Sequence, residues 1–374
     1  MRVTWLTDMD RSSSGYGNLS VPLMTGLVNR GHRVICLGSG YKGEEHDYPF
    51  TLIPVAELGE ANGMIRNLVQ LKETDALVVA LDINIQENFL SQPWKRELRY
   101  VGLFPVESDP ISMTWAAVLH QMDARLVLSQ FGLRELEKAG LTGTFLPISL
   151  DTEAWRPPGP EERAQIRKLM GMGDDVFVAL TVAENQERKH ISRSLEVYKE
   201  FISRPDAPKS KYWIVTRQRS HWGWNLSDMA IEFGLSDHVA LMEKGMPSRN
   251  LWALFAASDC FLLTSKCEGL GMCLLESHAV GLPVAATDCS AITELVADGL
   301  GFPIPWETSL RDPFGNTKRY LASISKGADV LMQVSKLSPE ERLTRCHRSV
   351  ALIKERTPER AIDILETALG VLHV

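Results

Sequence analysis

Two glutamates, separated by seven residues, flank a short turn that contains two glycines. Glu268 follows a predicted strand, and Glu276 lies a little over one turn into the predicted helix that comes next. Gly269 and Gly271 allow a ligand close to the backbone, and the first amides of the helix would face an anion. The spacing therefore predicts an anion site between two carboxylates. The alternative is that Glu276 only favours the helix terminus or pairs with Lys266.

Two adjacent cations, Arg188 and Lys189, precede another predicted helix at 192–202. A guanidinium is a planar fork of donors and an ammonium is a point charge, so the pair suits a diphosphate. The alternative is a solvated charge cluster at the start of a helix.

A second glycine-containing turn, with Gly15, Gly17 and Ser20, follows the first predicted strand. Such a turn lets backbone N–H groups approach a phosphate or a sugar. A dinucleotide site also needs an acid at the end of the second strand, but the run 33–37 leads into Gly-Ser-Gly. The sequence therefore disfavours a NAD-dependent oxidoreductase. Direct contact with a substrate and a glycine turn without a ligand both stay open.

The 374 residues exceed what one hydrophobic core supports, so we expect two domains of comparable size. Hydrophobic residues make up 44% and charged residues 23%, which excludes disordered, collagen-like and coiled-coil chains. No apolar run approaches the roughly 20 residues that cross a bilayer, and the N-terminus lacks a signal-peptide pattern. The 6 cysteines show no zinc spacing. We expect a cytoplasmic protein with free, buried thiols.

The net charge of −7 is distributed unevenly. Residues 1–156 carry 14 Lys and Arg against 19 Asp and Glu, a net of −5, and the remainder carries 26 against 28. Proteins that bind polyanions normally show a basic face. Neither half does so by count, although an average can conceal a local patch. Nucleic acid is therefore not an expected partner.

Short β-branched runs alternate with amphipathic stretches along the chain, which predicts parallel βαβ units. The proline-rich stretch 155–160 predicts a hinge. The expected fold class is α/β, with two Rossmann-like, doubly wound parallel sheets that face a central cleft, where ligands bind at the carboxyl ends of strands. Expected strands lie at 3–6, 33–37, 76–80, 99–103, 125–128, 143–145, 176–182, 212–216, 239–242, 260–264 and 283–287. Expected helices include 20–30, 131–138, 192–202, 248–257 and 272–280.

These motifs resemble the retaining glycosyltransferases of the GT-B fold, specifically the large family 4, which carries a Glu-x7-Glu motif. Residues 103–108 resemble its Tyr-Phe-Pro-Val-Asp stretch, and residues 123–132 resemble its segment from Asp-Ala to Ser-x-Phe-Gly. Residues 147–151 resemble its Pro-His-Gly-Val-Asp turn, with the His and Gly replaced. The resemblance covers residues 1 to about 300.

The resemblance implies transfer of a sugar from a nucleotide diphosphate to an acceptor hydroxyl, with retention and without a metal. Many relatives hold the donor diphosphate with an arginine and a lysine. This chain has Glu184 at the usual arginine position and resembles a subgroup in which Arg188 and Lys189 hold the diphosphate.

By the same resemblance, Glu268 would contact hydroxyls of the donor sugar, and Glu276 would accept hydrogen bonds from the ribose 2′ and 3′ hydroxyls. Glu107 stands where the relatives have Asp and would orient the acceptor hydroxyl. The other implied donor contacts are the backbone of Gly271, Met272 and Cys273, the turn at Gly15 and Gly17, and, near the base, Arg217, Glu243 and Gly245.

The implied domains are an acceptor domain at 1–156, a donor domain at 157–355, and a last helix at 356–374 that packs back on the first domain. The implied donor is a UDP- or GDP-sugar, with no resident cofactor. No side chain stands out as a covalent nucleophile, so departure and attack on the same face is the favoured path. The donor sugar, the acceptor and the oligomeric state stay open.

Three alternatives remain beside this interpretation. A sugar-nucleotide epimerase shares the fold but needs acid–base residues that the sequence does not show. A non-catalytic binding protein would not need both glutamates and the cation pair. A transferase acting on a hydroxylated base in DNA is a special case of the acceptor, and the acidic first half argues against it.

Two further motifs are discounted. Asp8 and Asp10 form the Asp-x-Asp that binds a metal–diphosphate in the other main glycosyltransferase fold, but they lie far in sequence from Arg188. We interpret them as a solvated or loop-capping pair, and no metal is implied. The aromatic stretch 221–224 suits stacking on a sugar or base, but packing is the preferred interpretation.

Overall fold

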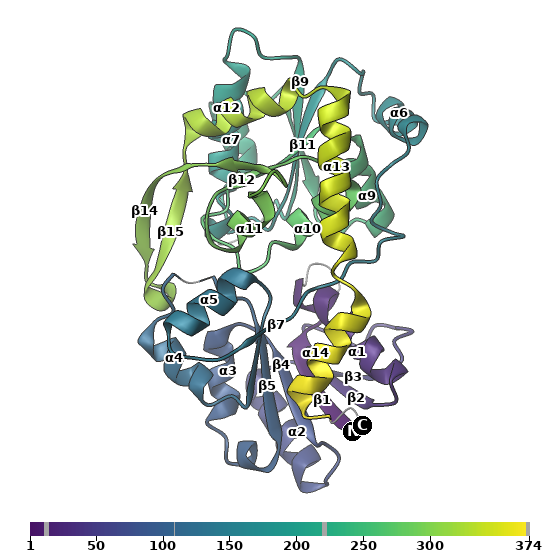
Figure 1. The fold of residues 1–374 in the computed structure, drawn as a ribbon, viewed down its shortest axis with the longest axis vertical. Helices are drawn as coiled ribbons and strands as arrows, with labels where there is room; N and C mark the ends of the chain where they lie inside the picture. Colours follow the sequence, from purple (N-terminus) through teal and green to yellow (C-terminus); the bar gives the residue numbers. More distant parts are fainter. Residues whose placement is uncertain (11–14, 108, 219–222, 372–374) are drawn as a thin grey trace. The chain divides into compact units, whose positions relative to one another are not determined.

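The chain divides into two compact units, each with its own parallel sheet and surrounding helices (Figure 1). The structure is a computed structural model that describes residues 1–10, 15–107, 109–218 and 223–371. Unit 1 comprises Met1–Ser149, Pro313–Thr317 and Arg356–Val374, and unit 2 comprises Leu150–Asp312 and Lys318–Glu355.

The strands of unit 1 are β1 (Arg2–Asp8), β2 (Arg33–Ser39), β3 (Thr51–Val55), β4 (Ala76–Ala80), β5 (Arg99–Phe104), β6 (Ala124–Val127) and β7 (Thr144–Phe145). Its helices are α1 (Gly15–Asn29), α2 (Leu58–Gln70), α3 (Ile83–Leu90), η1 (Pro93–Glu97), α4 (Met113–His120), α5 (Gln130–Lys138) and α14 (Pro358–Leu369). The sheet has the order β3-β2-β1-β4-β5-β6-β7, and its neighbours pair in parallel.

The sheet of unit 1 is buried on both faces in its centre. All five side chains of β4 are buried, which is typical of a parallel strand covered by helices on each side. Helix α14 packs against α1, and there Arg30 and His32 bind the buried carboxylate of Glu366 at 2.6 and 2.8 Å. The last helix is thereby fixed to unit 1.

The strands of unit 2 are β8 (Phe177–Val182), β9 (Ser210–Thr216), β10 (Val239–Glu243), β11 (Cys260–Leu263), β12 (Val284–Thr287), β13 (Phe302–Ile304), β14 (Trp306–Asp312) and β15, which begins at the unit boundary (Thr317–Ala322). The α-helices are α6 (Pro160–Leu169), α7 (Ile191–Ile202), α8 (Leu226–Glu232), α9 (Ser248–Ala257), α10 (Met272–Val280), α11 (Thr293–Val296), α12 (Ile324–Ser335) and α13 (Pro339–Lys354). The 3₁₀ turns of unit 2 are η2 (Glu187–Lys189) and η3 (Ser290–Ile292). The tip between β14 and β15 forms η4 (Phe314–Asn316), whose residues belong to unit 1.

The sheet of unit 2 has a reversal of strand order at its centre. Its order is β10-β9-β8-β11-β12-β13, while β14 and β15 form a separate two-stranded sheet. From β8 the chain proceeds outwards through β9 and β10 and then returns to β11, on the other side of β8. Such a switch point leaves a crevice at the carboxyl ends of the two central strands, where ligands of open α/β sheets bind.

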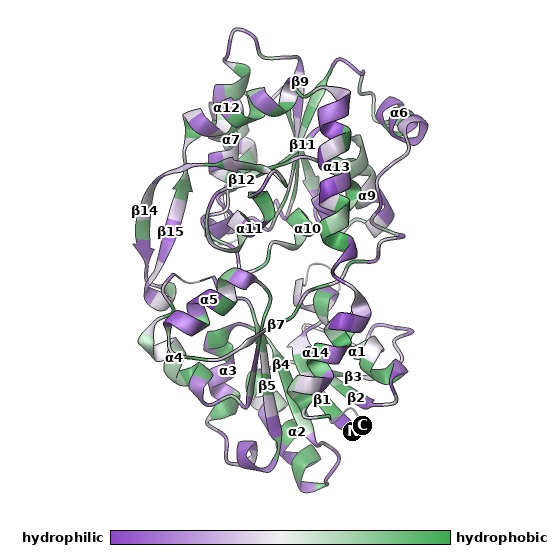
Figure 2. Ribbon diagram, in the orientation of Figure 1, coloured by the Kyte–Doolittle hydropathy of each residue, from purple (hydrophilic) through white to green (hydrophobic). Residues whose placement is uncertain are grey.

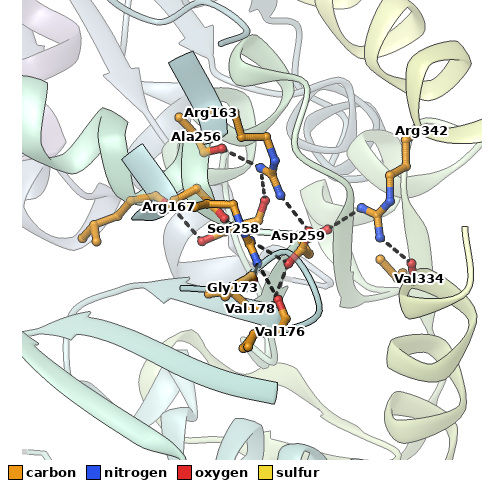
Figure 3. A network of polar contacts seen from close by, with 12 residues as sticks. Arg163, Arg167, Gly173, Val176, Val178, Ala256, Ser258, Asp259, Val334 and Arg342 are labelled. Atoms are coloured by element: carbon orange, nitrogen blue, oxygen red, sulfur yellow. Dashed lines mark hydrogen bonds and ion pairs between the residues drawn. The ribbon is translucent and has the colours of Figure 1, made fainter. Parts of the chain in front are cut away.

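An arginine-rich network fixes helices to the opposite, amino edge of this sheet (Figure 3). The carboxylate of Asp259, just before β11, lies 2.7 Å from Arg163 and 3.2 Å from Arg167, both on α6. Arg342 on α13 donates to the Asp259 carbonyl at 3.1 Å. Arg163 and Arg167 also donate to the carbonyls of residues 256–258, at the end of α9. These carbonyls have no partner within the helix, so the network satisfies them.

The predicted fold class, two Rossmann-like parallel sheets, is confirmed. The sequence did not predict β3, whose Pro54 has no N–H to donate; β3 lies at the edge of its sheet, where proline is tolerated. It also did not predict β14, because every side chain of that strand except its last is exposed. The expected start of the first helix at Ser20 is wrong: α1 begins at Gly15, so Gly15 and Gly17 form its first turn.

Figure 2 shows apolar residues concentrated in the strands of both sheets, whereas α6 is mostly polar. Within the described ranges, no helix combines the length and the apolar character needed to cross a membrane.

Candidate functional site

The candidate site of unit 2 begins at the switch point, where the loops after β8 and β11 meet. The chain leaves β8 through η2, which carries Arg188 and Lys189, and enters α7 after His190, whose φ of 50° is left-handed. The loop after β11 carries Glu268 and leads into α10. The structure therefore brings together three residues that the sequence predicted as site residues.

The carboxylate of Glu268 is held by both predicted cations. Its Oε1 lies 2.6 Å from Lys189 Nζ and accepts from the Ser265 hydroxyl at 2.8 Å, and its Oε2 lies 2.9 Å from Arg188 Nη1. Only 3% of Glu268 is exposed. Burial raises the pKa of Glu268, but the charges of Lys189 and Arg188 and the hydrogen bonds outweigh it and lower the pKa to about 2. Glu268 is therefore a buried, ionised anchor for both cations.

Backbone contacts fix this ion cluster in place. Arg188 Nη1 also donates to the Cys267 carbonyl at 2.9 Å, and the Arg188 carbonyl accepts from the Lys266 amide at 2.8 Å. The Glu268 amide donates to the Ser290 hydroxyl at 2.8 Å. Three loops, after β8, β11 and β12, are thereby tied together around one carboxylate. Ser265 and Ser290 were missed by the sequence interpretation, because no motif distinguishes a serine that supports a site.

Glu276 lies on α10 and differs sharply from Glu268. It is half-buried, and its side chain makes no hydrogen bond or ion pair with any residue that the structure describes. Burial raises the pKa of Glu276 to about 8, although the charge of Lys244 opposes the rise. The alternative pairing with Lys266 is not formed, since Lys266 Nζ bonds Glu187 instead. Glu276 thus has a carboxyl group with hydrogen-bonding capacity that the described residues do not use.

The turn before α10 requires glycine. Gly271 is the N-cap of α10 with φ 79° and ψ 64°, a left-handed conformation that disfavours other residues. The amides of Met272 and Cys273 open the helix and have no partner within it. Burial raises the pKa of the Cys273 thiol to about 12, so the thiol is neutral. The start of α10 therefore offers N–H groups between the two glutamates, and the anion site expected there stays a prediction.

A second ion cluster lies at the carboxyl ends of β8, β9 and β10. Glu184 Oε1 lies 3.2 Å from Arg217 Nε, and Glu184 Oε2 lies 3.1 Å from Lys244 Nζ. Arg217 was a predicted site residue, whereas Lys244 was missed and Glu184 was noted only as a departure from the resembling family. Their positions directly after adjacent strands were the signal that would have linked them.

Other predicted residues lie nearby or in unit 1. Glu243 is exposed and accepts from the Gln218 amide at 3.4 Å. The buried Asn185 binds the backbone N–H and C=O of Trp224 at 3.1 and 2.8 Å, which fixes the end of the aromatic stretch. His221 and Trp222 lie outside the described residues. Glu107 follows β5 in unit 1 and is half-buried.

The first loop of unit 1 fits the interpretation of Asp8 and Asp10 as a loop-capping pair. The carboxylate of Asp8 accepts from the Asp10 amide at 2.9 Å. Gly17 is buried in the first turn of α1, beside Tyr16, whose hydroxyl donates to Asp82 after β4. These residues lie at the carboxyl edge of the unit 1 sheet.

Comparison with solved structures defines the fold. The structure of Anabaena HepE in complex with UDP-glucose aligns with a TM-score of 0.75 and 15% identity, covering 99% of each chain. Together with the two parallel sheets, this shows that the chain has the GT-B fold. More specifically, residues 162–307 match the family model described as glycosyl transferases group 1.

Two curated relatives resemble part of the chain. It is 28% identical over 220 residues to D-inositol 3-phosphate glycosyltransferase from Acidothermus cellulolyticus, covering 58% of this chain and 46% of that protein. It is 30% identical over 167 residues to the GDP-mannose-dependent alpha-(1-6)-phosphatidylinositol monomannoside mannosyltransferase from Mycolicibacterium smegmatis, covering 41% and 40%. The chain spans less than half the length of these relatives.

Proposed function

We propose that this protein is a retaining glycosyltransferase that moves a sugar from a nucleotide-diphosphate sugar to an acceptor hydroxyl without a metal. The observation that carries the proposal is the cluster of Arg188, Lys189 and Glu268 at the switch point, beside the partnerless carboxyl of Glu276. The match to group 1 glycosyl transferases includes all four residues.

The cation pair would stabilise the departing diphosphate. Charge builds on the phosphate oxygens as the glycosidic bond breaks, and fixed cations stabilise that charge without reorganisation. Arg188 and Lys189 are held in place by Glu268 before a donor arrives. The first backbone amides of α10 would add a partial positive charge to that of the two cations.

The position of Glu268 favours a path in which departure and attack occur on the same face. Both of its oxygens accept hydrogen bonds from protein groups, and cations lower its pKa to about 2. A carboxylate stabilised in this way is a weak nucleophile. Glu268 would therefore position the two cations rather than form a covalent intermediate. Any contact with hydroxyls of the donor sugar would use lone pairs of its oxygens that the protein groups leave open.

The donor and acceptor would divide between the two domains. Unit 2 would hold the donor, with Glu276 facing the ribose diol, and unit 1 would hold the acceptor near Glu107. UDP and GDP are the proposed nucleotide carriers of the donor sugar, since UDP-glucose is bound by the structural relative and GDP-mannose is used by a curated one. Acceptors with a polyol ring, such as D-inositol 3-phosphate, are the first to test.

The test is turnover of UDP- and GDP-hexoses with a panel of hydroxyl acceptors, followed by proton NMR of the product. The expected result is a product with the anomeric configuration of the donor, at a rate that falls at least tenfold in Lys189→Ala. Lys209→Met is the matched control, because Lys209 forms an exposed pair with Asp175 before β8 and β9. Interconversion of the donor sugar would indicate an epimerase, and binding without turnover a non-catalytic protein; either contradicts the proposal.

A further inference from the structure

A cavity of about 340 Å³ lies in unit 1, at the amino ends of three neighbouring strands. Arg99, Ala124 and Thr144 line it, and they are the first residues of β5, β6 and β7. The last turn of α14, a helix that contacts β5 and β6, forms another wall of the cavity. The proposed acceptor would approach the opposite, carboxyl edge of this sheet, near Glu107, so the proposed reaction does not use this cavity.

Two arginines line the cavity, and neither forms an ion pair with any residue that the structure describes. Arg99 donates through Nε to the Ala368 carbonyl at 2.5 Å, and its two Nη groups have no partner among those residues. Arg125 donates through Nε to the Thr142 carbonyl at 2.7 Å and through Nη1 to two carbonyls at the end of α4, at 2.9 and 2.7 Å. Its Nη2 bonds none of the described residues. Two fixed cations beside the cavity therefore keep donors that the described part of the chain does not use.

The charges around the cavity do not cancel. Asp123 also lines the cavity, but it already binds the Tyr100 amide at 2.8 Å and Lys95 Nζ at 3.2 Å. The two arginines lie against the carboxyl-terminal ends of α4 and α14, and each end carries about half a negative charge, less than the full charge of a guanidinium. Burial lowers the pKa of Arg125, although the charge of Asp123 opposes this, so the guanidinium is partly removed from water. A net positive charge remains, which favours an anionic ligand.

The size and the other lining residues of the cavity indicate more than a simple anion. The volume is that of roughly ten water molecules in the liquid, which is more than inorganic phosphate fills. Thr142, Thr144 and Asp123 border the same space. Hydroxyl groups of a ligand can bond threonine hydroxyls and donate to a carboxylate. The cavity therefore suits a ligand that has a phosphate at one end and hydroxyl groups at the other.

We propose that this cavity binds a small phosphate monoester that carries free hydroxyl groups. The phosphate oxygens accept hydrogen bonds from Arg99 and Arg125, since the planar donor fork of a guanidinium matches a phosphate. The hydroxyl groups meet Asp123 and the two threonines. The site is separate from the proposed donor and acceptor sites, so the proposal does not depend on whether the protein transfers a sugar.

The test is isothermal titration of the full chain with glycerol 3-phosphate, inorganic phosphate and glycerol. Glycerol 3-phosphate should bind at least roughly tenfold more tightly than inorganic phosphate or glycerol, because only the ester meets both the arginines and the hydroxyl-binding residues. No binding of the ester, or equal affinity for inorganic phosphate, would overturn the proposal. Displacement of the ester by phosphatidylglycerol vesicles would assign the phosphate to a lipid headgroup and would also overturn it.

Variants separate this cavity from the cation cluster in unit 2, which could also hold a phosphate. Arg99→Gln should weaken binding of the ester at least roughly tenfold, whereas Arg33→Gln, which alters an exposed pair with Glu73 in the same unit, should leave it unchanged. Lys189→Ala should retain the affinity, and loss of binding in that variant would place the ester in unit 2 and refute the proposal. Thr144→Val should weaken the ester but not inorganic phosphate. If Arg99→Gln and Thr144→Val both retain the affinity for the ester, Arg99 only fixes the end of α14, and the proposal is wrong.

Discussion

Lys189 Nζ lies 2.6 Å from Glu268 Oε1, so the first glutamate of the motif neutralises a candidate phosphate-binding cation before any ligand is bound. A donor diphosphate must therefore compete with Glu268 for Lys189, and for Arg188 at 2.9 Å. Such competition weakens binding of the ground state. Under the proposed function, the cations are already positioned for the charge that would develop on the leaving diphosphate.

Glu268→Gln should bind nucleoside diphosphate more tightly and turn over more slowly. Loss of the carboxylate removes the competitor for Arg188 and Lys189, which should lower Kd up to roughly tenfold, while the cations lose their anchor and kcat falls. Calorimetry and steady-state kinetics measure the two effects. Ser265→Ala, which removes only one hydrogen bond to Glu268, should shift both values in the same direction but less. An unchanged Kd with unchanged kcat would contradict this account of the cluster.

Glu276→Ala should lose the preference for ribonucleotides over 2′-deoxyribonucleotides. At about pH 9, above its raised pKa of about 8, Glu276 is charged. Hydrogen bonds to a charged group contribute about 1.5–3 kcal/mol, so at that pH wild-type protein should bind the 2′-deoxy compound roughly 10- to 100-fold more weakly. Glu276→Gln should lie between the two proteins. Competition between UDP and 2′-deoxy-UDP gives the ratio. The same ratio in wild type and Glu276→Ala would end the assignment of Glu276 to ribose.

Glu276 and Glu268 should make stability depend on pH in opposite directions. Burial raises the folded-state pKa of Glu276 from 4.5 to about 8, so the folded protein keeps a proton that the unfolded chain releases. Its contribution to stability should fall as pH rises through this window. For Glu268, whose buried carboxyl has its pKa lowered to about 2 by Lys189 and Arg188, stability is lost as pH falls from 4.5 towards 2.

Urea unfolding across this pH range measures both effects. The stability of Glu276→Gln relative to wild type should increase between about pH 5 and pH 8, because Gln has no proton to lose. A constant difference over that range would contradict the raised pKa of Glu276.

Asp259→Asn should destabilise the protein without changing nucleotide affinity. Removal of this charge leaves Arg163 and Arg167 without their carboxylate, and breaking such a partly buried ion pair from one side should cost up to about 3 kcal/mol. Asp175→Asn, in an exposed pair with Lys209, should cost less than about 1 kcal/mol. Urea midpoints give the first comparison and UDP or GDP titration the second. Comparable losses in both variants would show that the network in Figure 3 adds no more stability than an exposed ion pair.

The core of the fold could be predicted because its strands are local apolar runs. The expected strand at 76–80 coincides with β4, and the helices expected at 248–257 and 272–280 coincide with α9 and α10. β3 and β14 could not be predicted in this way, since a proline interrupts one and exposed polar residues compose the other. Edge strands and surface hairpins carry little of the hydrophobic pattern on which such predictions depend.

The sequence could nominate individual residues of the candidate site, but it could not predict which of them form ion pairs with one another. Sequence motifs pointed to Arg188, Lys189 and Glu268 separately, with no indication that both cations bind the one carboxylate. The contact between Glu184 and Lys244 spans 60 positions, and no local pattern encodes it. Only the order of strands in the sheet brings these loops together.

The most direct test of the central claim is the affinity for a nucleoside diphosphate relative to its monophosphate. Wild-type protein should bind UDP or GDP at least roughly tenfold more tightly than UMP or GMP, because the second phosphate meets Arg188 and Lys189. Lys189→Ala should lose most of this preference, and Lys209→Met should keep it. Equal affinity for diphosphate and monophosphate in the wild type, or an unchanged preference in Lys189→Ala, would contradict a diphosphate site at this cluster.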